Sequence, residues 1–141
     1  MVHGLDEEKD ESTDNKVLNI FKETLGLNSL KLEDIGRSHR LGKKENGKKR
    51  PIIVRFATYR QKAMVYSNKR KLKGTRTVIS ENLTPSRYAL YKKCLDRFGS
   101  RNVWTYDGRI YYLTGNKLRN GDAEKKVITT EEDLLETVVN N

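Results

Sequence analysis

Apolar residues recur with a helical period near the start of the chain. Val17, Phe21 and Leu25 follow one another at four-residue steps, with Leu18 beside the first of them, and Gly26 comes directly after. Residues at i, i+4 and i+8 share one face of an α-helix, and glycine is common just past a helix end. The pattern predicts a helix over residues 13–25.

Two strands, a second helix and a third strand follow. Residues 35–41 alternate weakly, and residues 51–56 form the clearest strand, with Pro51 at its first position, where the missing N–H does least harm. The spacing Thr58-x-x-Gln61 is a capping box and predicts a helix that runs to about residue 71. Residues 77–79 form a short strand, which completes a first α+β unit.

A second group of elements begins at Thr84, which is predicted to cap a helix with Pro85 in its first turn and Gly99 at its end. The predicted apolar face of this helix consists of Tyr88, Tyr91, Leu95 and Phe98. Further on, Thr129-x-x-Glu132 reads as a capping box that opens a last helix.

Between these helices, Asp107-Gly108 is the strongest hairpin signal in the chain. It separates predicted strands at residues 103–106 and 109–113. A two-residue turn would place four side chains on one face of the hairpin: Trp104, Tyr106, Arg109 and Tyr111. The sequence thus predicts an α+β protein of two domains, residues 1–80 and residues 81–141, the second built from a helix, a hairpin and a terminal helix.

Charge is concentrated in one part of the chain. The net charge is +10, and residues 37–76 contain fifteen Lys or Arg and a single acidic residue, Glu45. A confined basic segment is the electrostatic signature of a protein that binds a polyanion. Nucleic acid is therefore the first hypothesis, and the second is a protein-interaction module of a viral accessory or assembly protein that binds an acidic partner.

The densest cations lie in a loop over residues 42–50 and on the strands beside it. The candidate nucleic-acid contacts here are Arg37, Arg40, Lys43, Lys44, Lys48, Lys49, Arg50 and Arg55. Arg55 alternates with Val54 and Phe56, so it should stand on the open face of the sheet if those two are core. The alternatives are a solvated turn or nuclear localisation signal for the loop and carboxylate pairing for the arginines, but Glu45 is the segment's one acid, so partners should be scarce.

Two further groups are candidates. At the end of the second helix, Arg70, Lys71 and Lys73 can contact phosphate or complement the helix dipole. On the hairpin, the aromatic face can be a stacking platform or part of the core. Tyr106 beside the turn is the ring most expected to be exposed, with Arg109 as its phosphate anchor.

Several strings resemble a known family. They are RSHRLG at residues 37–42, RPIIVRF at 50–56, RKLKG at 70–74 and ISENLT at 79–84. In this order and spacing they resemble the first-open-reading-frame protein of LINE-type (non-LTR) retrotransposons, and also related baculovirus few-polyhedra proteins. The resemblance spans about residues 2–113, covering an RNA-recognition-motif (RRM) domain and a C-terminal domain.

The resemblance implies sequence-tolerant binding of single-stranded RNA or DNA, strand annealing, and a cytoplasmic ribonucleoprotein with the nucleus as an additional location. Lys92 and Lys93 match a basic pair of the family's equivalent helix, and a nucleic-acid-binding aromatic lies near Tyr106. The chain departs from an RRM in two respects. Its first strand is expected to be mostly missing, and Pro51 and Ile53 stand where stacking aromatics are usual. The parent protein is expected to be a homo-oligomer through a coiled coil that this chain lacks.

Catalysis has little support in the sequence. His3, His39 and Cys94 form no metal-ligand cluster or nucleophile–base pair, and no glycine-rich phosphate loop is present. We expect no enzyme activity, cofactor or metal. No window approaches the roughly 18 apolar residues of a membrane span, and a single cysteine fits a reducing compartment.

Overall fold

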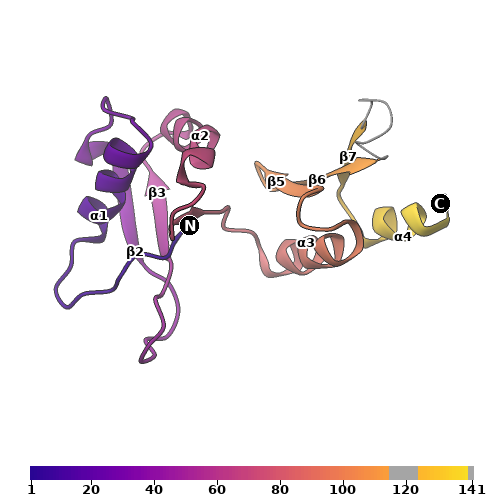
Figure 1. Cartoon of the computed structure of the whole chain (residues 1–141), viewed down its shortest axis with the longest axis horizontal. Helices are drawn as coiled ribbons and strands as arrows, with labels where there is room; N and C mark the ends of the chain where they lie inside the picture. The colour runs from indigo at the N-terminus through magenta and orange to yellow at the C-terminus, as the bar shows by residue number, and fades with distance from the viewer. Residues whose placement is uncertain (115–123, 140–141) are drawn as a thin grey trace. The chain divides into compact units, whose positions relative to one another are not determined.

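The computed structural model describes residues 1–114 and 124–139, with the backbone alone at 138 and 139. The chain forms two compact units, Met1–Asn82 and Leu83–Asn141, each with its own hydrophobic core (Figure 1). Both combine helices with an antiparallel sheet, so the α+β class predicted from the sequence is confirmed.

The N-terminal unit contains a four-stranded antiparallel sheet, here called sheet A, with strand order β2-β3-β1-β4. Its strands are β1 (Val2–His3), β2 (Ile35–Arg40), β3 (Ile52–Phe56) and β4 (Val78–Ile79). Its helical elements are α1 (Thr13–Asn19), the π-helix η1 (Ile20–Thr24), the 3-10 turns η2 (Leu32–Asp34) and η3 (Lys69–Leu72), and α2 (Tyr59–Ser67). The two-residue β1 is central in the sheet, between β3 and β4.

Both long helices of this unit pack on one face of sheet A. Phe21 of η1 and Val65 of α2 share one core cluster with Val2, Ile35 and Ile52 of the strands, and all five are at least 94% buried. The side chains that alternate with these strand residues therefore point to the opposite face, which we call the open face.

The second helix ends earlier than the sequence pattern predicts. α2 stops at Ser67, and Asn68 breaks the helix because its side-chain amide donates to the Met64 carbonyl instead of continuing the backbone ladder. The buried residue of α2 is Val65, whereas Tyr59 in its first turn is 59% exposed. The core contact of α2 is thus made by the aliphatic side chain of Val65.

The acidic segment that precedes α1 contacts the end of the β2–β3 pair through a buried ion pair between Glu11 and Arg40. Arg40 Nε donates to Glu11 Oε1 at 2.7 Å, and its other guanidinium nitrogens reach the carbonyls of Leu5, Asp6 and Arg50 at 2.6–2.9 Å. The two side chains are only 5% and 8% exposed. The hydrogen bond from Arg40 lowers the pKa of the Glu11 carboxyl from 4.5 to about 2.

The C-terminal unit contains α3 (Pro85–Phe98), a three-stranded antiparallel sheet B of order β5-β6-β7, and α4 (Glu131–Val139). The strands are β5 (Val103–Tyr106), β6 (Arg109–Thr114) and β7 (Glu124–Ile128). α3 packs against one face of sheet B (Figure 1) through Leu90 and Cys94, which meet Val103, Ile110 and Tyr112.

The hairpin prediction is confirmed in detail. Asp107 and Gly108 have φ of 51° and 76°, the left-handed conformation that a two-residue turn of this kind requires. Tyr106 pairs with Arg109 and Trp104 with Tyr111. Because directly opposed residues share a face, all four lie on the same side of sheet B, as the turn predicted.

Three features of this unit differ from the sequence prediction. β7 was not predicted. α4 is capped by Thr130 and Asp133, whereas the sequence predicted Thr129 and Glu132. The Thr130 hydroxyl accepts from the Asp133 N–H, and the Asp133 carboxylate accepts from the N–H groups of Thr129 and Thr130. Tyr88 is 53% exposed, and Leu90 and Cys94 form the core in its place. None of the helices in the described part of the chain is long and apolar enough to cross a membrane.

We predict that Glu11→Gln lowers the free energy of unfolding at pH 7 by about 3 kcal/mol, because it leaves the Arg40 charge buried without its partner. A lowered folded-state pKa stabilises the protein above the unfolded value of 4.5, and this contribution is lost as the pH falls toward 2. Urea unfolding between pH 7 and pH 2.5 should show this acid-dependent loss in the wild type and a smaller one in the variant.

The matched control is Glu8→Gln, which removes a carboxylate that is 71% exposed and lies 3.7 Å from Lys16. This change should leave stability nearly unaltered, since exposed ion pairs contribute little. Equal stability of the wild type and Glu11→Gln at pH 7 would contradict the role assigned to the buried pair.

Candidate nucleic-acid interface

Two arginines stand directly opposite each other on the open face of sheet A. Arg37 of β2 pairs with Arg55 of β3, and His39 pairs with Ile53 in the same two strands. Both arginines are exposed, whereas Ile52 and Val54, which alternate with Ile53 and Arg55, pack in the core. The expectation that Arg55 stands on the open face follows from this alternation and is met.

A β-bulge at Gly36 places Arg37 on this face. Ile35 pairs with Phe56 on the helix-covered side, and the next pair is Arg37 with Arg55, so Gly36 is an extra residue in β2. A Cβ at Gly36 would lie 3.2 Å from the Arg55 carbonyl oxygen, which is tighter than most such contacts. Strict alternation from Ile35 would have pointed Arg37 to the helices.

This pair of arginines has no anion of its own. Within the described residues neither guanidinium makes a hydrogen bond or an ion pair. No acidic residue belongs to any strand of sheet A. Like charges directly opposite each other on a sheet repel, so the arrangement is destabilising until an anion neutralises it. Two guanidinium forks side by side can bind phosphate oxygens through several charge-assisted hydrogen bonds.

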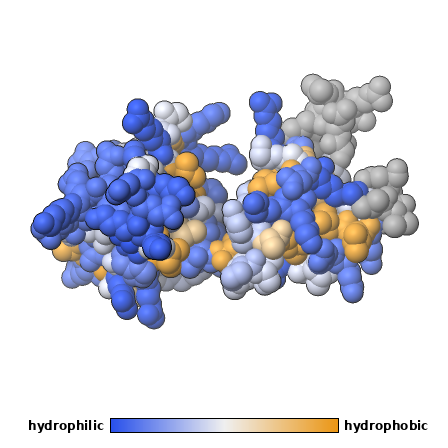
Figure 2. Space-filling model, turned by 90° about the horizontal axis from the view of Figure 1, so that it is seen from below, coloured by the Kyte–Doolittle hydropathy of each residue, from blue (hydrophilic) through white to orange (hydrophobic). Residues whose placement is uncertain are grey.

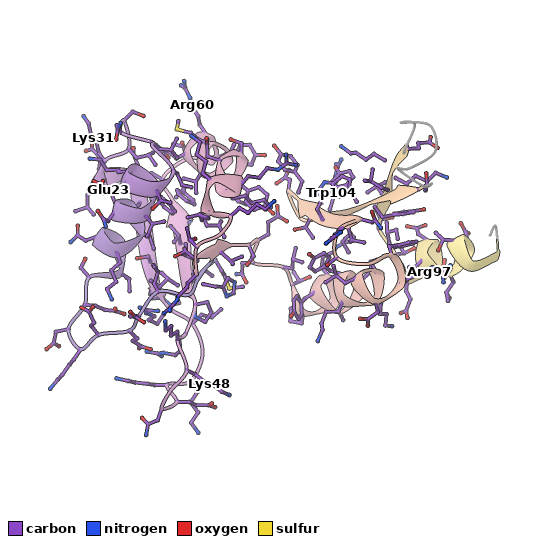
Figure 3. The ribbon with its side chains drawn as sticks, viewed as in Figure 1. Glu23, Lys31, Lys48, Arg60, Arg97 and Trp104 are labelled. Atoms are coloured by element: carbon purple, nitrogen blue, oxygen red, sulfur yellow. The ribbon has the colours of Figure 1, made fainter. Side chains whose placement is uncertain are left out.

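The loop over residues 42–50 adds further cations beyond the ends of β2 and β3 (Figure 1). Lys43 and Lys44 are exposed and have no ion-pair partner in the described residues. Lys48 lies 2.9 Å from Glu45 and is 76% exposed, and Lys49 lies 2.7 Å from Asp6 and is 41% exposed. The N-terminal unit accordingly shows a mostly hydrophilic surface in Figure 2, and Figure 3 shows Lys48 at the far end of the loop.

Three candidate residues instead have structural roles. Arg40 is buried against Glu11. Arg50 pairs with Glu7, which lowers the pKa of that carboxyl through the hydrogen bond, and it donates to the Gly42 carbonyl at 2.9 Å. Lys71 donates to the Leu25 carbonyl at 3.1 Å and so caps the end of η1. We leave these three out of the interface.

The expectation that acidic partners would be scarce is therefore wrong. It counted acids within residues 37–76, but Asp6, Glu7 and Glu11 come from the segment before α1 and reach the base of the loop. Ion pairing depends on distance in space, which a count along the chain does not measure. Among the other candidates of this unit, Arg70 and Lys73 are exposed and have no such partner in the described residues.

In the C-terminal unit the candidates fall on α3 and on the β5–β6 hairpin. Lys92 and Lys93 are exposed on α3; Lys92 lies 5.8 Å from the ring of Tyr88, and Lys93 pairs with Glu131 of α4. Tyr106, 48% exposed, and Arg109 lie at the hairpin tip on the face of sheet B away from α3.

One cation of that face is not among the candidates predicted from the sequence. Lys125 of β7 holds its ammonium 4.4 Å from the centre of the Tyr111 ring. Its strand pairs with β6, and Tyr111 faces Val127. The only signal was the short apolar pair Val127-Ile128 after two lysines, which is too weak to predict a strand.

Among the residues that the structure describes, no group of three or more His, Cys, Asp or Glu could hold a metal ion. Cys94 is buried, and burial raises the pKa of its thiol. No protein-family model, curated protein or solved structure matches the chain.

We predict that Arg55→Gln raises the free energy of unfolding by about 0.2–1 kcal/mol at low ionic strength, because it removes the repulsion from Arg37. The gain should shrink in high salt, which screens exposed charges. Chemical denaturation at two salt concentrations measures both effects. Arg60→Gln is the matched control, since Arg60 is an exposed arginine on α2 (Figure 3). A stability loss in Arg55→Gln but not in Arg60→Gln would show that Arg55 has a structural role.

Proposed function

We propose that this protein binds single-stranded RNA or DNA with little sequence preference, chiefly through phosphates contacted by the open face of sheet A. The observation that carries the proposal is the Arg37–Arg55 pair, two opposed and unneutralised arginines on an exposed sheet. Phosphate contacts position a protein on nucleic acid but carry no sequence information, so a phosphate-binding sheet is sequence-tolerant.

We also propose that Met1–Asn82 is an RRM-type domain. Its element order is strand, helix, two strands, helix, strand, and its sheet order is β2-β3-β1-β4 with both helices on one face. This is the arrangement of a split βαβ fold, which RRM domains use for RNA. Together with the strings noted above, it supports membership of the LINE first-open-reading-frame family.

The open face differs from a standard RRM surface in its chemistry. No Phe, Tyr or Trp stands on it; the residues of the central and edge strands that point there include Ile53, His39 and His3. Without these three ring types, the face depends on charge more than a standard RRM surface does. A surface of this kind suits a protein that coats RNA and promotes annealing, because neutralised phosphates repel a second strand less strongly.

Affinity for an oligonucleotide of about 15 nucleotides should fall steeply with salt. If roughly five phosphates are contacted, the slope of log K on log salt is about −3.5, at about −0.7 per contact for single strands. Arg55→Gln should cost about 1–2 kcal/mol and reduce the slope by about 0.7, since a charge-assisted contact from a fixed strand has no substitute. Fluorescence anisotropy at four salt concentrations measures both.

The control is again Arg60→Gln, which removes the same charge on the helix-covered side of the unit. It should leave affinity and slope almost unchanged. A salt-independent affinity would exclude the proposal. Binding of polyglutamate as tight as that of the oligonucleotide would favour the alternative, an acidic protein partner.

Single changes in the loop should behave differently from Arg55→Gln. Lys43→Gln or Lys44→Gln should each cost less than about 0.5 kcal/mol, because neighbouring lysines on an exposed loop can take over the contact. Changing both together with Lys48 should have a clear effect in the same anisotropy assay. A single lysine change as costly as Arg55→Gln would indicate an ordered contact in the loop.

A further inference from the structure

Three side chains form a row across the face of sheet B that lies away from α3. The rings of Trp104 and Tyr111 stack with centroids 5.9 Å apart and an angle of 17° between their planes. The ammonium of Lys125 lies 4.4 Å from the centre of the Tyr111 ring. The strand order β5-β6-β7 puts Trp104 and Lys125 on opposite sides of Tyr111. Trp104 is therefore the outer end of the row.

The outer end of this row lies at a sheet edge. β5 is an edge strand of sheet B, and Tyr111 is the only aromatic ring in contact with Trp104 among the described residues. Figure 3 shows Trp104 on the side of its sheet away from α3. A flat ring of another molecule can extend the row at this end, because parallel offset stacking is the favoured geometry of aromatic groups.

The charge of this face indicates which kind of planar ligand it can bind. Strand alternation places Tyr106, Arg109, Lys125 and Val127 on it together with Trp104 and Tyr111, and none of the strand residues there is acidic. Val127 is 46% exposed. A planar ring attached to anions, as in a nucleotide, matches both the aromatic row and the two cations.

We propose that this face of sheet B is a base-stacking site, in which an unpaired base lies against Trp104 and the adjoining phosphates contact Lys125 and Arg109. The proposal rests on the function proposed above. It assigns the base of the ligand to sheet B, whereas the open face of sheet A binds phosphates. A base in a duplex is already stacked and paired, so this site discriminates single strands from duplexes, whereas contacts to phosphates alone do not.

The chain offers a direct probe, because Trp104 is its single tryptophan. Titration of the full chain with a single-stranded 15-mer in high salt, where phosphate contacts are weakened, should quench the tryptophan emission in step with binding. An abasic strand of the same length should bind but leave the emission almost unchanged. Heparin, a polyanion without bases, should behave like the abasic strand.

Substitutions distinguish the contribution of the Trp104 ring to binding from that of the Lys125 charge. Trp104→Leu should lose about 5- to 150-fold in affinity for the single strand, the equivalent of one stacked base, and should leave the salt slope unaltered. Trp104→Phe should retain most of the affinity, which also guards against misfolding as the cause of a loss. Lys125→Gln should weaken binding, and Lys126→Gln is its matched control because Lys126 alternates with it along β7.

The two proposals fail in different ways. Unchanged emission on binding of the 15-mer, with affinity that still depends on Arg55, would overturn the stacking site and leave the function standing. Equal affinity of Trp104→Leu and the wild type for the single strand would do the same. Loss of selectivity for single strands over duplexes in Trp104→Leu would support the assignment of strand discrimination to this face.

Discussion

The β-bulge at Gly36 is the constraint on which the N-terminal unit depends. One extra residue in β2 inverts the side-chain alternation after Ile35, so Arg37 points to the open face and Arg40 to the helix-covered side. Arg37 then meets Arg55, and Arg40 meets Glu11. A single backbone irregularity thus separates an arginine that is available to a ligand from one that is used to hold the fold.

The distribution of charge shows the same separation. The basic segment has a large formal charge, but the acidic residues before α1 neutralise the cations at the base of the loop through Arg40, Arg50 and Lys49. The candidate residues of this unit without an ion-pair partner in the described part of the chain include Arg37, Arg55, Lys43, Lys44, Arg70 and Lys73. The cations that hold the fold together are thus different residues from the opposed arginines of the open face, which can bind a polyanion without a structural cost.

The two units present complementary chemistry. The strands of sheet A have arginines and no Phe, Tyr or Trp on their open face, and sheet B has an aromatic row flanked by cations. Phosphate and base are the two recognisable parts of a nucleotide, and each unit has the groups that bind one of them better. This division is the physical basis of the single-strand preference that we propose.

The sequence determined the elements whose formation depends only on residues close by in the chain. The helix around Val17 and Phe21 follows from its apolar period, and the hairpin register follows from Asp107-Gly108, because a two-residue turn leaves one pairing possible. Tertiary structure decided the rest. β7 forms because β6 offers it a partner, the bulge at Gly36 is invisible to a count of alternating residues, and the partners of Arg40 and Arg50 lie about 30 to 40 residues away. These features depend on which groups meet in space, so the sequence by itself could indicate that the chain binds a polyanion but only the fold could select the residues that are available to do so.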